Sequence, residues 1–151
     1  MRTRRKTLQH SAIVAGLLAA TGLFPGHVLA FNAKAFDAKT VSDALKSLGV
    51  AAPTESKEVT IIGPDIAENG SVVPLGASTA LAGVKQLLIL VEKNPNALVA
   101  VFNLTDSVDA NISTRAKMGQ SSDVYAVAVM NDGRVLFAKK EVKVTLGGCG
   151  G

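Results

Sequence analysis

The residue best suited to covalent chemistry is Cys149, the only cysteine in a chain of 151 residues. Four glycines flank it: Gly147, Gly148, Gly150 and Gly151. Because glycine has no side chain to pack and the greatest backbone freedom, this segment is predicted to form a flexible arm that carries the thiol into solvent. Nothing within the arm supplies a cation or a helix N-terminus to activate the thiol, so activation must come from other proteins.

The first thirty residues have the pattern of an export signal. An apolar run over 12–24 follows a basic cluster of Arg2, Arg4, Arg5 and Lys6, and a small-residue cleavage site ends at Ala30. Residues 3–9 resemble a twin-arginine signal, with Thr7 where an aromatic residue is usual. We expect residues 1–30 to be a twin-arginine-type signal peptide that is removed, and the mature protein to be periplasmic. The alternative, a retained membrane anchor, is disfavoured because the apolar run is short.

Removal of the signal changes the charge and the chemistry of the chain. It takes away four of the sixteen basic residues and none of the twelve acidic ones. Twelve basic and twelve acidic residues remain, so the mature chain has no excess positive charge with which to bind nucleic acid. Both histidines, His10 and His27, leave with it. Without imidazole, Ser-His and Cys-His activation are excluded, and the acidic residues show no metal-loop or glycosidase spacing. We predict a non-catalytic protein without a metal or cofactor.

The elements that must position the arm lie in residues 31–146, whose length suits one domain. Near its start, apolar residues recur at helical spacing and predict a short helix: Val41, Ala44, Leu45 and Leu48. Thr40 or Asp37 can cap its beginning, and Gly49 can end it. After Pro53 the period changes to two, which predicts seven strands: 58–62, 71–75, 85–91, 97–104, 111–117, 124–130 and 134–144. The last strand leads directly to the arm at 147–151.

Turn signals and strand lengths predict how these strands are arranged. Asn69-Gly70 marks one turn, and Asn131-Asp132-Gly133 predicts a hairpin between the last two strands. Seven strands without long helices predict a mainly β, immunoglobulin-like antiparallel β-sandwich that lacks the disulfide and the tryptophan of antibody domains. Because Pro74 cannot donate a ladder hydrogen bond, its strand is expected at a sheet edge or at a bulge.

Several segments together resemble one known family. The ending Gly147-Gly148-Cys149-Gly150-Gly151 is the hallmark of SoxY, the carrier subunit of the bacterial thiosulfate-oxidising Sox system. Further similar segments are 68–74, 92–96, 113–115 and 140–145. The resemblance therefore covers essentially the whole mature chain, and the twin-arginine-like leader belongs to the same pattern.

This resemblance implies a fold, a cargo and a set of partners. It implies an immunoglobulin-like sandwich that pairs as a heterodimer with a second small β subunit, SoxZ. It also implies that the haem enzyme SoxAX joins thiosulfate oxidatively to Cys149 and that the hydrolase SoxB then releases sulfate. A persulfide is left, which the sulfur dehydrogenase SoxCD oxidises further. On this hypothesis the protein presents thiosulfonate and persulfide intermediates on Cys149 to partner enzymes.

Two other functions would make different demands on the tail. A ubiquitin-like carrier would be activated at the carboxylate of Gly151 and would not need Cys149, but such activation normally requires cytoplasmic ATP, so export argues against it. An exported structural or adhesive β module would use Cys149 only to form an intermolecular disulfide. If the chain is a covalent carrier, Cys149→Ser should abolish pathway activity and leave folding and partner binding intact.

The last predicted strand carries three lysines close to the arm: Lys139, Lys140 and Lys143. They could attract anionic sulfur species or acidic partner surfaces. The alternative, which the sequence favours, is that they form the solvated face of a strand.

Overall fold

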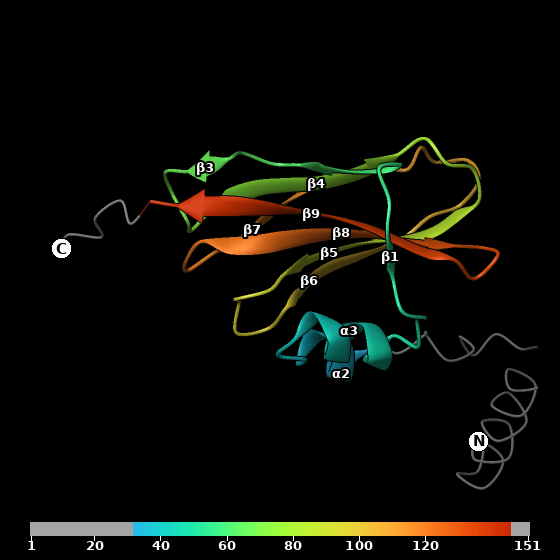
Figure 1. Cartoon of the computed structure of the whole chain (residues 1–151), viewed down its shortest axis with the longest axis horizontal. Coiled ribbons are helices and arrows are strands. Elements are labelled where there is room, and N and C mark those ends of the chain that lie inside the picture. Colours follow the sequence, from blue (N-terminus) through green and yellow to red (C-terminus); the bar gives the residue numbers. More distant parts are fainter. Residues whose placement is uncertain (1–31, 146–151) are drawn as a thin grey trace, which may run out of the picture. The chain divides into compact units, whose positions relative to one another are not determined.

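The computed structural model describes residues 32–145, and the predicted boundaries after Ala30 and after Leu146 lie outside this range. Within it, two short helices precede nine strands, which form a six-stranded and a three-stranded sheet packed against each other (Figure 1). The predicted mainly β, immunoglobulin-like sandwich preceded by a short helix is confirmed. Over the same residues, no helix is long and apolar enough to cross a membrane.

The predicted helix is α3 (Val41–Ser47), and it begins and ends where the sequence indicates. The Thr40 side chain caps it by accepting a hydrogen bond from Asp43 N at 3.1 Å. Gly49 follows with a φ of 70°, a left-handed conformation that glycine adopts without strain. Asp37, the other predicted cap, instead ends α2 (Ala33–Phe36), a helix too short to give a periodic signal.

The strands form a large sheet and a small one. In spatial order the large sheet contains β1 (Thr54–Glu55), β9 (Val135–Val144), β8 (Ser122–Met130), β5 (Val84–Val91) and β6 (Leu98–Asn103). The small sheet contains β2 (Val59–Ile62), β4 (Val73–Thr79) and β7 (Asn111–Ala116). The ninth strand, β3 (Ile66–Ala67), pairs with the end of β9. Strand β9 therefore has neighbours on both sides.

Two strands were not predicted, and both change the sheet from purely antiparallel to mixed. Strands β1 and β3 have two residues each and pair parallel with β9. A strand of two residues has no recognisable alternation, and its position depends on a partner far along the chain. The seven predicted strands all exist, as β2 and β4 to β9.

The prediction for Pro74 is corrected. Strand β4 extends to Thr79 and is the central strand of the small sheet, so it is not an edge strand. However, β2 pairs with β4 only from Gly76 to Thr79, and Pro74 is paired only with Arg115 of β7. Proline is accepted here because the strand has a single neighbour at this point.

The hydrophobic core lies on both faces of the large sheet. Between the sheets, Leu87 and Ile89 of β5 are fully buried with Val124 of β8. On the opposite face, Leu88 and Leu90 of β5 pack beneath α2 and α3 (Figure 1). Full burial of such a side chain contributes roughly 1.5–3 kcal/mol. The centre of the large sheet is therefore a rigid support for its neighbour β9.

The predicted hairpin between β8 and β9 is confirmed. Gly133 adopts a φ of 89°, and the Asp132 carboxylate accepts hydrogen bonds from Arg134 N at 2.9 Å and Arg134 Nε at 2.7 Å. These bonds hold the pKa of Asp132 below its ordinary value. The turn sets a register in which Val129 faces Val135 and Ser122 faces Val142. It thereby fixes where β9 ends.

Candidate functional site

The candidate site begins where β9 ends, at residues Lys143, Val144 and Thr145, which we call the arm root. These are the last residues that the structure describes before the glycine-rich segment. The predicted site residues, Cys149 and its four flanking glycines, lie outside the described range. The structure shows how the arm root is held.

Three successive backbone N–H groups of the arm root donate to groups from two distant segments. Lys143 N donates to the carbonyl oxygen of Asp65 at 3.0 Å, and Thr145 N donates to that of Ala67 at 3.0 Å. Between them, Val144 N donates in the other direction, to Ser121 Oγ at 2.9 Å. Strand β3 lies alongside, with Ile66 in register with Lys143 (Figure 1). The chain is thus fixed on both sides immediately before the arm.

The turn at Gly70 holds this end of the molecule together. Met118 N donates to the carbonyl oxygen of Gly70 at 2.7 Å. A Cβ on Gly70 would lie 2.8 Å from Val144 Cγ1 and closer still to the carbonyl oxygen of Met118. Only glycine fits between these groups without displacing them. The segment after β3 is therefore packed against the arm root.

A half-buried lysine of β9 holds the segment that precedes β3 by charge. Lys140 Nζ lies 2.8 Å from Asp65 Oδ1 and donates to the carbonyl oxygen of Gly63 at 2.8 Å. The hydrogen bond and the charge of Lys140 hold the pKa of Asp65 below its ordinary value. Because the Asp65 side chain is 87% exposed, we assign this ion pair a positioning role and little stability.

The three lysines of β9 do not form a common anion-binding cluster. Lys140 is paired with Asp65, and Lys139 lies 3.5 Å from Asp123, whose charge raises the pKa of Lys139. Lys143 is exposed and has no ion pair among the described residues. This arrangement is that of a solvated strand face, the alternative that the sequence favours.

Sequence reasoning missed the groups that anchor the arm root. The sequence predicts the strand 134–144 and the Asn69-Gly70 turn, but it does not predict the contact between them. The carbonyl oxygens of Asp65 and Ala67 give no sequence signal, because every residue has a backbone carbonyl. The Ser121 hydroxyl belongs to no motif. Of these, only Ser121 could have been noticed, as a hydroxyl beside the buried Ser122 at the start of a strand.

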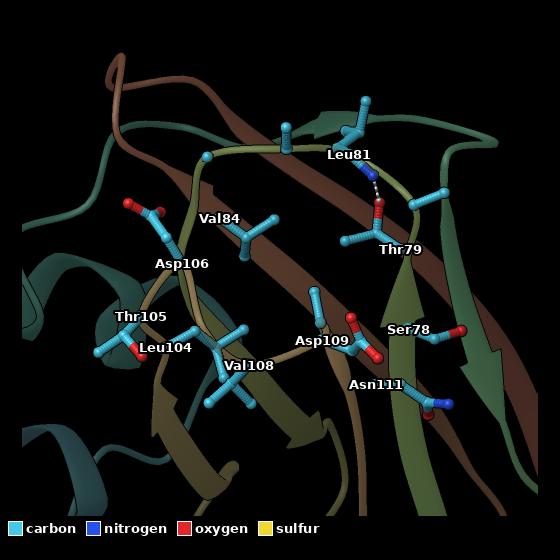
Figure 2. A pocket seen from close by; sticks show the side chains of 14 residues that line it. Ser78, Thr79, Leu81, Val84, Leu104, Thr105, Asp106, Val108, Asp109 and Asn111 are labelled. Carbon is cyan, nitrogen blue, oxygen red and sulfur yellow. Dashed lines mark hydrogen bonds between the residues drawn. The ribbon is translucent and has the colours of Figure 1, made fainter.

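A cavity lies at the other end of the sandwich, far along the strands from the arm root. It measures about 670 Å³ and opens between the loops 80–83 and 104–110. Figure 2 shows Val84, Leu104 and Val108 among its lining residues, and Leu81 N donating to Thr79 Oγ1 at 3.2 Å. Asp106 and Asp109 stand at this cavity as well. It was not predicted from the sequence, because two loops form it.

Neither end of the described domain carries the groups of an independent catalyst that we can recognise. Over residues 32–145, no three His, Cys, Asp or Glu side chains are grouped to hold a metal ion. The hydroxyls at the arm root, of Ser121 and Thr145, are engaged with backbone groups. The arrangement can anchor a chain segment.

Comparison with known proteins identifies one family. The model of the family described as sulfur oxidation protein SoxY matches residues 45–149, more than half of the chain. The solved structure of the sulfur carrier protein SoxY from Chlorobium limicola f thiosulfatophilum is 28% identical and superposes with a TM-score of 0.62. The match covers 70% of this chain and 94% of that one. No curated protein sequence gives a match.

More distant structures share the fold alone. A superoxide reductase (neelaredoxin) from Ignicoccus hospitalis is 16% identical, with a TM-score of 0.52 over 66% of this chain and 87% of that chain. A candidate superoxide reductase from Thermotoga maritima is 9% identical, with a TM-score of 0.54 over 62% and 94%. At such low identity these similarities describe the β-sandwich and carry no information about activity.

Proposed function

The chain belongs to the SoxY family of sulfur oxidation proteins, and from this premise we propose that it is a periplasmic carrier that holds thiosulfate-derived sulfur on Cys149. The observation that best supports this proposal is the arm root, where three successive backbone N–H groups are anchored just before the glycine-flanked cysteine. A carrier needs a fixed point from which a thin segment extends. The family match also runs as far as Cys149.

The proposed loading step is an oxidative condensation. The Cys149 thiolate and thiosulfate join through a new S–S bond to give Cys–S–S–SO₃⁻, and two electrons pass to a haem-containing partner. In the next step, water attacks the terminal sulfur and the S–S bond to that sulfur breaks. Sulfate and one proton are released, and the persulfide Cys–S–SH remains on the carrier. A dehydrogenase partner can then oxidise the outer sulfur.

The carrier contributes tethering, and its partners contribute catalysis. Three residues separate Thr145 from Cys149, so the Cα of Cys149 can lie up to about 13 Å from that of Thr145 when the chain is extended. Glycine on both sides of the cysteine places no side chain in the way of a narrow channel. A tethered intermediate cannot diffuse away, and each enzyme meets it at high effective concentration.

The proposal includes export and a set of partners. We propose that residues 1–30 direct the folded chain through the twin-arginine pathway and are then removed. We further propose a heterodimer with a SoxZ-like subunit, served by SoxAX-, SoxB- and SoxCD-type enzymes. These assignments rest on the family and on the leader sequence.

The deciding experiment is an intact-mass measurement. The mature protein is purified and incubated with thiosulfate and the host's periplasmic extract, then measured before and after a reductant is added. A sulfur adduct that is located on Cys149 and removed by reductant is expected. Cys149→Ser should fold and bind its partners normally and acquire no adduct.

Two other results would contradict the proposal. If Cys149 stays unmodified, or if it only forms a disulfide-linked dimer, the chain is an exported structural module. If modification instead occurs at the carboxylate of Gly151 and survives Cys149→Ser, the chain is a ubiquitin-like carrier. Either result would exclude a sulfur-carrying role.

A further inference from the structure

The outer face of the small sheet has no part in the proposed function. Along β4, alternate residues point inward, and Val73, Leu75 and Ala77 are buried in the core. The residues between them point outward, away from the large sheet. The helices α2 and α3 pack against the large sheet, so they leave this outer face uncovered (Figure 1).

The half of this face nearest the arm root is apolar. Ile62 of β2 and Val72, the residue before β4, are large aliphatic side chains that are 45% and 52% exposed. Ile62 lies in register with Gly76, and a Cβ on Gly76 would stand 3.2 Å from the Ile62 Cβ. Pro74 is exposed between Val72 and Gly76. Ile62 of β2, Pro74 of β4 and Val72 just before β4 therefore give this half of the face a strip of exposed apolar side chains.

The same half carries positive charge without compensation. Pro74 is in register with Arg115 of β7, and a shallow depression of about 400 Å³ lies between them. Both Arg115 and Lys117 are exposed, and neither has an ion pair among the described residues. The outward positions of β2, β4 and β7 contain no carboxylate. The acidic residues of this end stand on other segments, such as Asp65 on the β3 segment.

This surface lies within reach of the arm. Gly70 touches Val144 of the arm root, and Val72 follows two residues later, at most about 7 Å along the chain. By chain length, the Cα of Cys149 can be up to about 13 Å from that of Thr145. A protein that takes Cys149 into a recessed reactive centre must therefore cover part of the surface around the root. An apolar strip bordered by unpaired cations suits a partner with an apolar, acidic rim.

We propose that Ile62, Val72, Pro74, Arg115 and Lys117, which we call the arm-side face, form the docking surface for the enzymes that load and unload Cys149. The inference rests on the proposed carrier function and extends it to the site of partner recognition. The partner's matching surface carries carboxylates around the opening that receives the arm. Docking here orients the arm toward that opening before any covalent step.

The test compares charge reversal on the arm-side face with charge reversal elsewhere. Arg115→Glu with Lys117→Glu is the test variant, and Lys57→Glu with Lys85→Glu, two exposed lysines at the opposite end, is the matched control. Protein purified from the periplasm is incubated with thiosulfate and the host's periplasmic extract, and the initial rate of adduct formation on Cys149 is followed by mass. The test variant should load about tenfold more slowly, and the wild-type rate should fall with added salt. The control should match wild type.

Two further measurements keep the result interpretable. Alkylation of Cys149 by iodoacetamide should proceed equally in all variants, because a small reagent needs no docking. Ile62→Ser with Val72→Ser should also slow loading while leaving the urea unfolding midpoint nearly unchanged, because both side chains are about half exposed. Equal loading rates in the test and control variants would overturn the proposal.

Other occupants of this face would give different results. If charge reversal releases a copurifying subunit or converts a dimer to a monomer, the arm-side face is a subunit interface and the proposal is wrong. If wild-type protein acquires no sulfur adduct at all, the carrier function itself fails, and the docking surface fails with it. A normal wild-type rate with an unaffected test variant rejects the docking surface alone.

Discussion

The two ends of the sandwich are built differently. At the end where the arm begins, β3, the Gly70 turn and Ser121 each contact β9 through hydrogen bonds or close packing. At the opposite end, the loops 80–83 and 104–110 line a cavity of about 670 Å³ (Figure 2). Backbone hydrogen bonds hold this end, from Thr79 N to the carbonyl oxygen of Ala110 at 2.9 Å and from Asn131 N to that of Gly83 at 2.8 Å. The same two sheets supply both ends, but the loops at the arm end pack against β9, whereas those at the opposite end leave a cavity between them.

The largest effect should come from filling the space at Gly70. Gly70→Ala would push a methyl group against the Met118 carbonyl and the Val144 side chain, which should destabilise the protein by about 1–3 kcal/mol. Urea unfolding measures the change. Gly119→Ala is the matched control, since a Cβ there meets nothing within 4 Å, and it should be neutral. Equal effects at the two glycines would show that the Gly70 turn is not tightly packed.

A smaller effect is expected from removing one anchor of the arm root. Ser121→Ala leaves Val144 N without its acceptor, which should cost about 1 kcal/mol. Hydrogen exchange at the Val144 amide should accelerate, while exchange in the centre of β8 stays slow. Ser107→Ala, in the open loop at the opposite end, should change neither. Unaltered exchange at Val144 would mean that the hydroxyl is not an important anchor.

The open end should tolerate insertion. Four residues of Gly and Ser added after Ser107 lengthen a surface loop, and the entropy of closing it should rise by less than about 0.6 kcal/mol. The same insertion after Asn69 should be far more damaging, because it displaces Gly70 from Met118 and Val144. Thermal unfolding of both variants checks this. Equal losses would remove the distinction between the two ends.

The smallest effect concerns the ion pair beside the arm root. Lys140 lowers the pKa of Asp65 in the folded protein. The pair therefore stabilises the fold at pH values above 3.8, the ordinary pKa of an aspartate side chain. That contribution is lost as the pH falls through the lowered folded pKa. Unfolding midpoints of wild type and Asp65→Asn should therefore differ slightly at neutral pH and converge in acid. Equal midpoints at every pH would assign the role of Asp65 to its backbone carbonyl alone, because Asp65→Asn retains that group.

The sequence predicts the strands of this fold better than it predicts their contacts. Alternation of apolar residues locates 124–130 and 134–144, and Asn131-Asp132-Gly133 joins them, because these signals are local. Strand β3 was missed, since two residues carry no period and its pairing depends on the distant β9. Pro74 was assigned to an edge because the sequence does not show that β2 is shorter than β4.

The candidate site divides in the same way. The glycine-flanked Cys149 is recognisable from residue type alone, and it remains a prediction because it lies outside the described residues. The anchoring of the arm root was not predictable, because it depends on the Ser121 hydroxyl and on backbone carbonyls that meet β9 only in the folded chain. Local chemistry can be read from a sequence, whereas the support beneath it requires the three-dimensional structure.

The position of β9 between neighbouring strands also has a mechanical meaning. Ladder hydrogen bonds run perpendicular to the strands in an antiparallel pair, such as β8 and β9, and are slanted in a parallel pair, such as β3 and β9. On the proposed carrier function, an enzyme that draws the arm tip into its channel would pull β9 along its own axis, against its bonds to both neighbours. This is loading in shear, in which many bonds must fail together, unlike peeling, in which they fail one by one. In this geometry the domain resists unfolding when a pulling force acts on the end of β9.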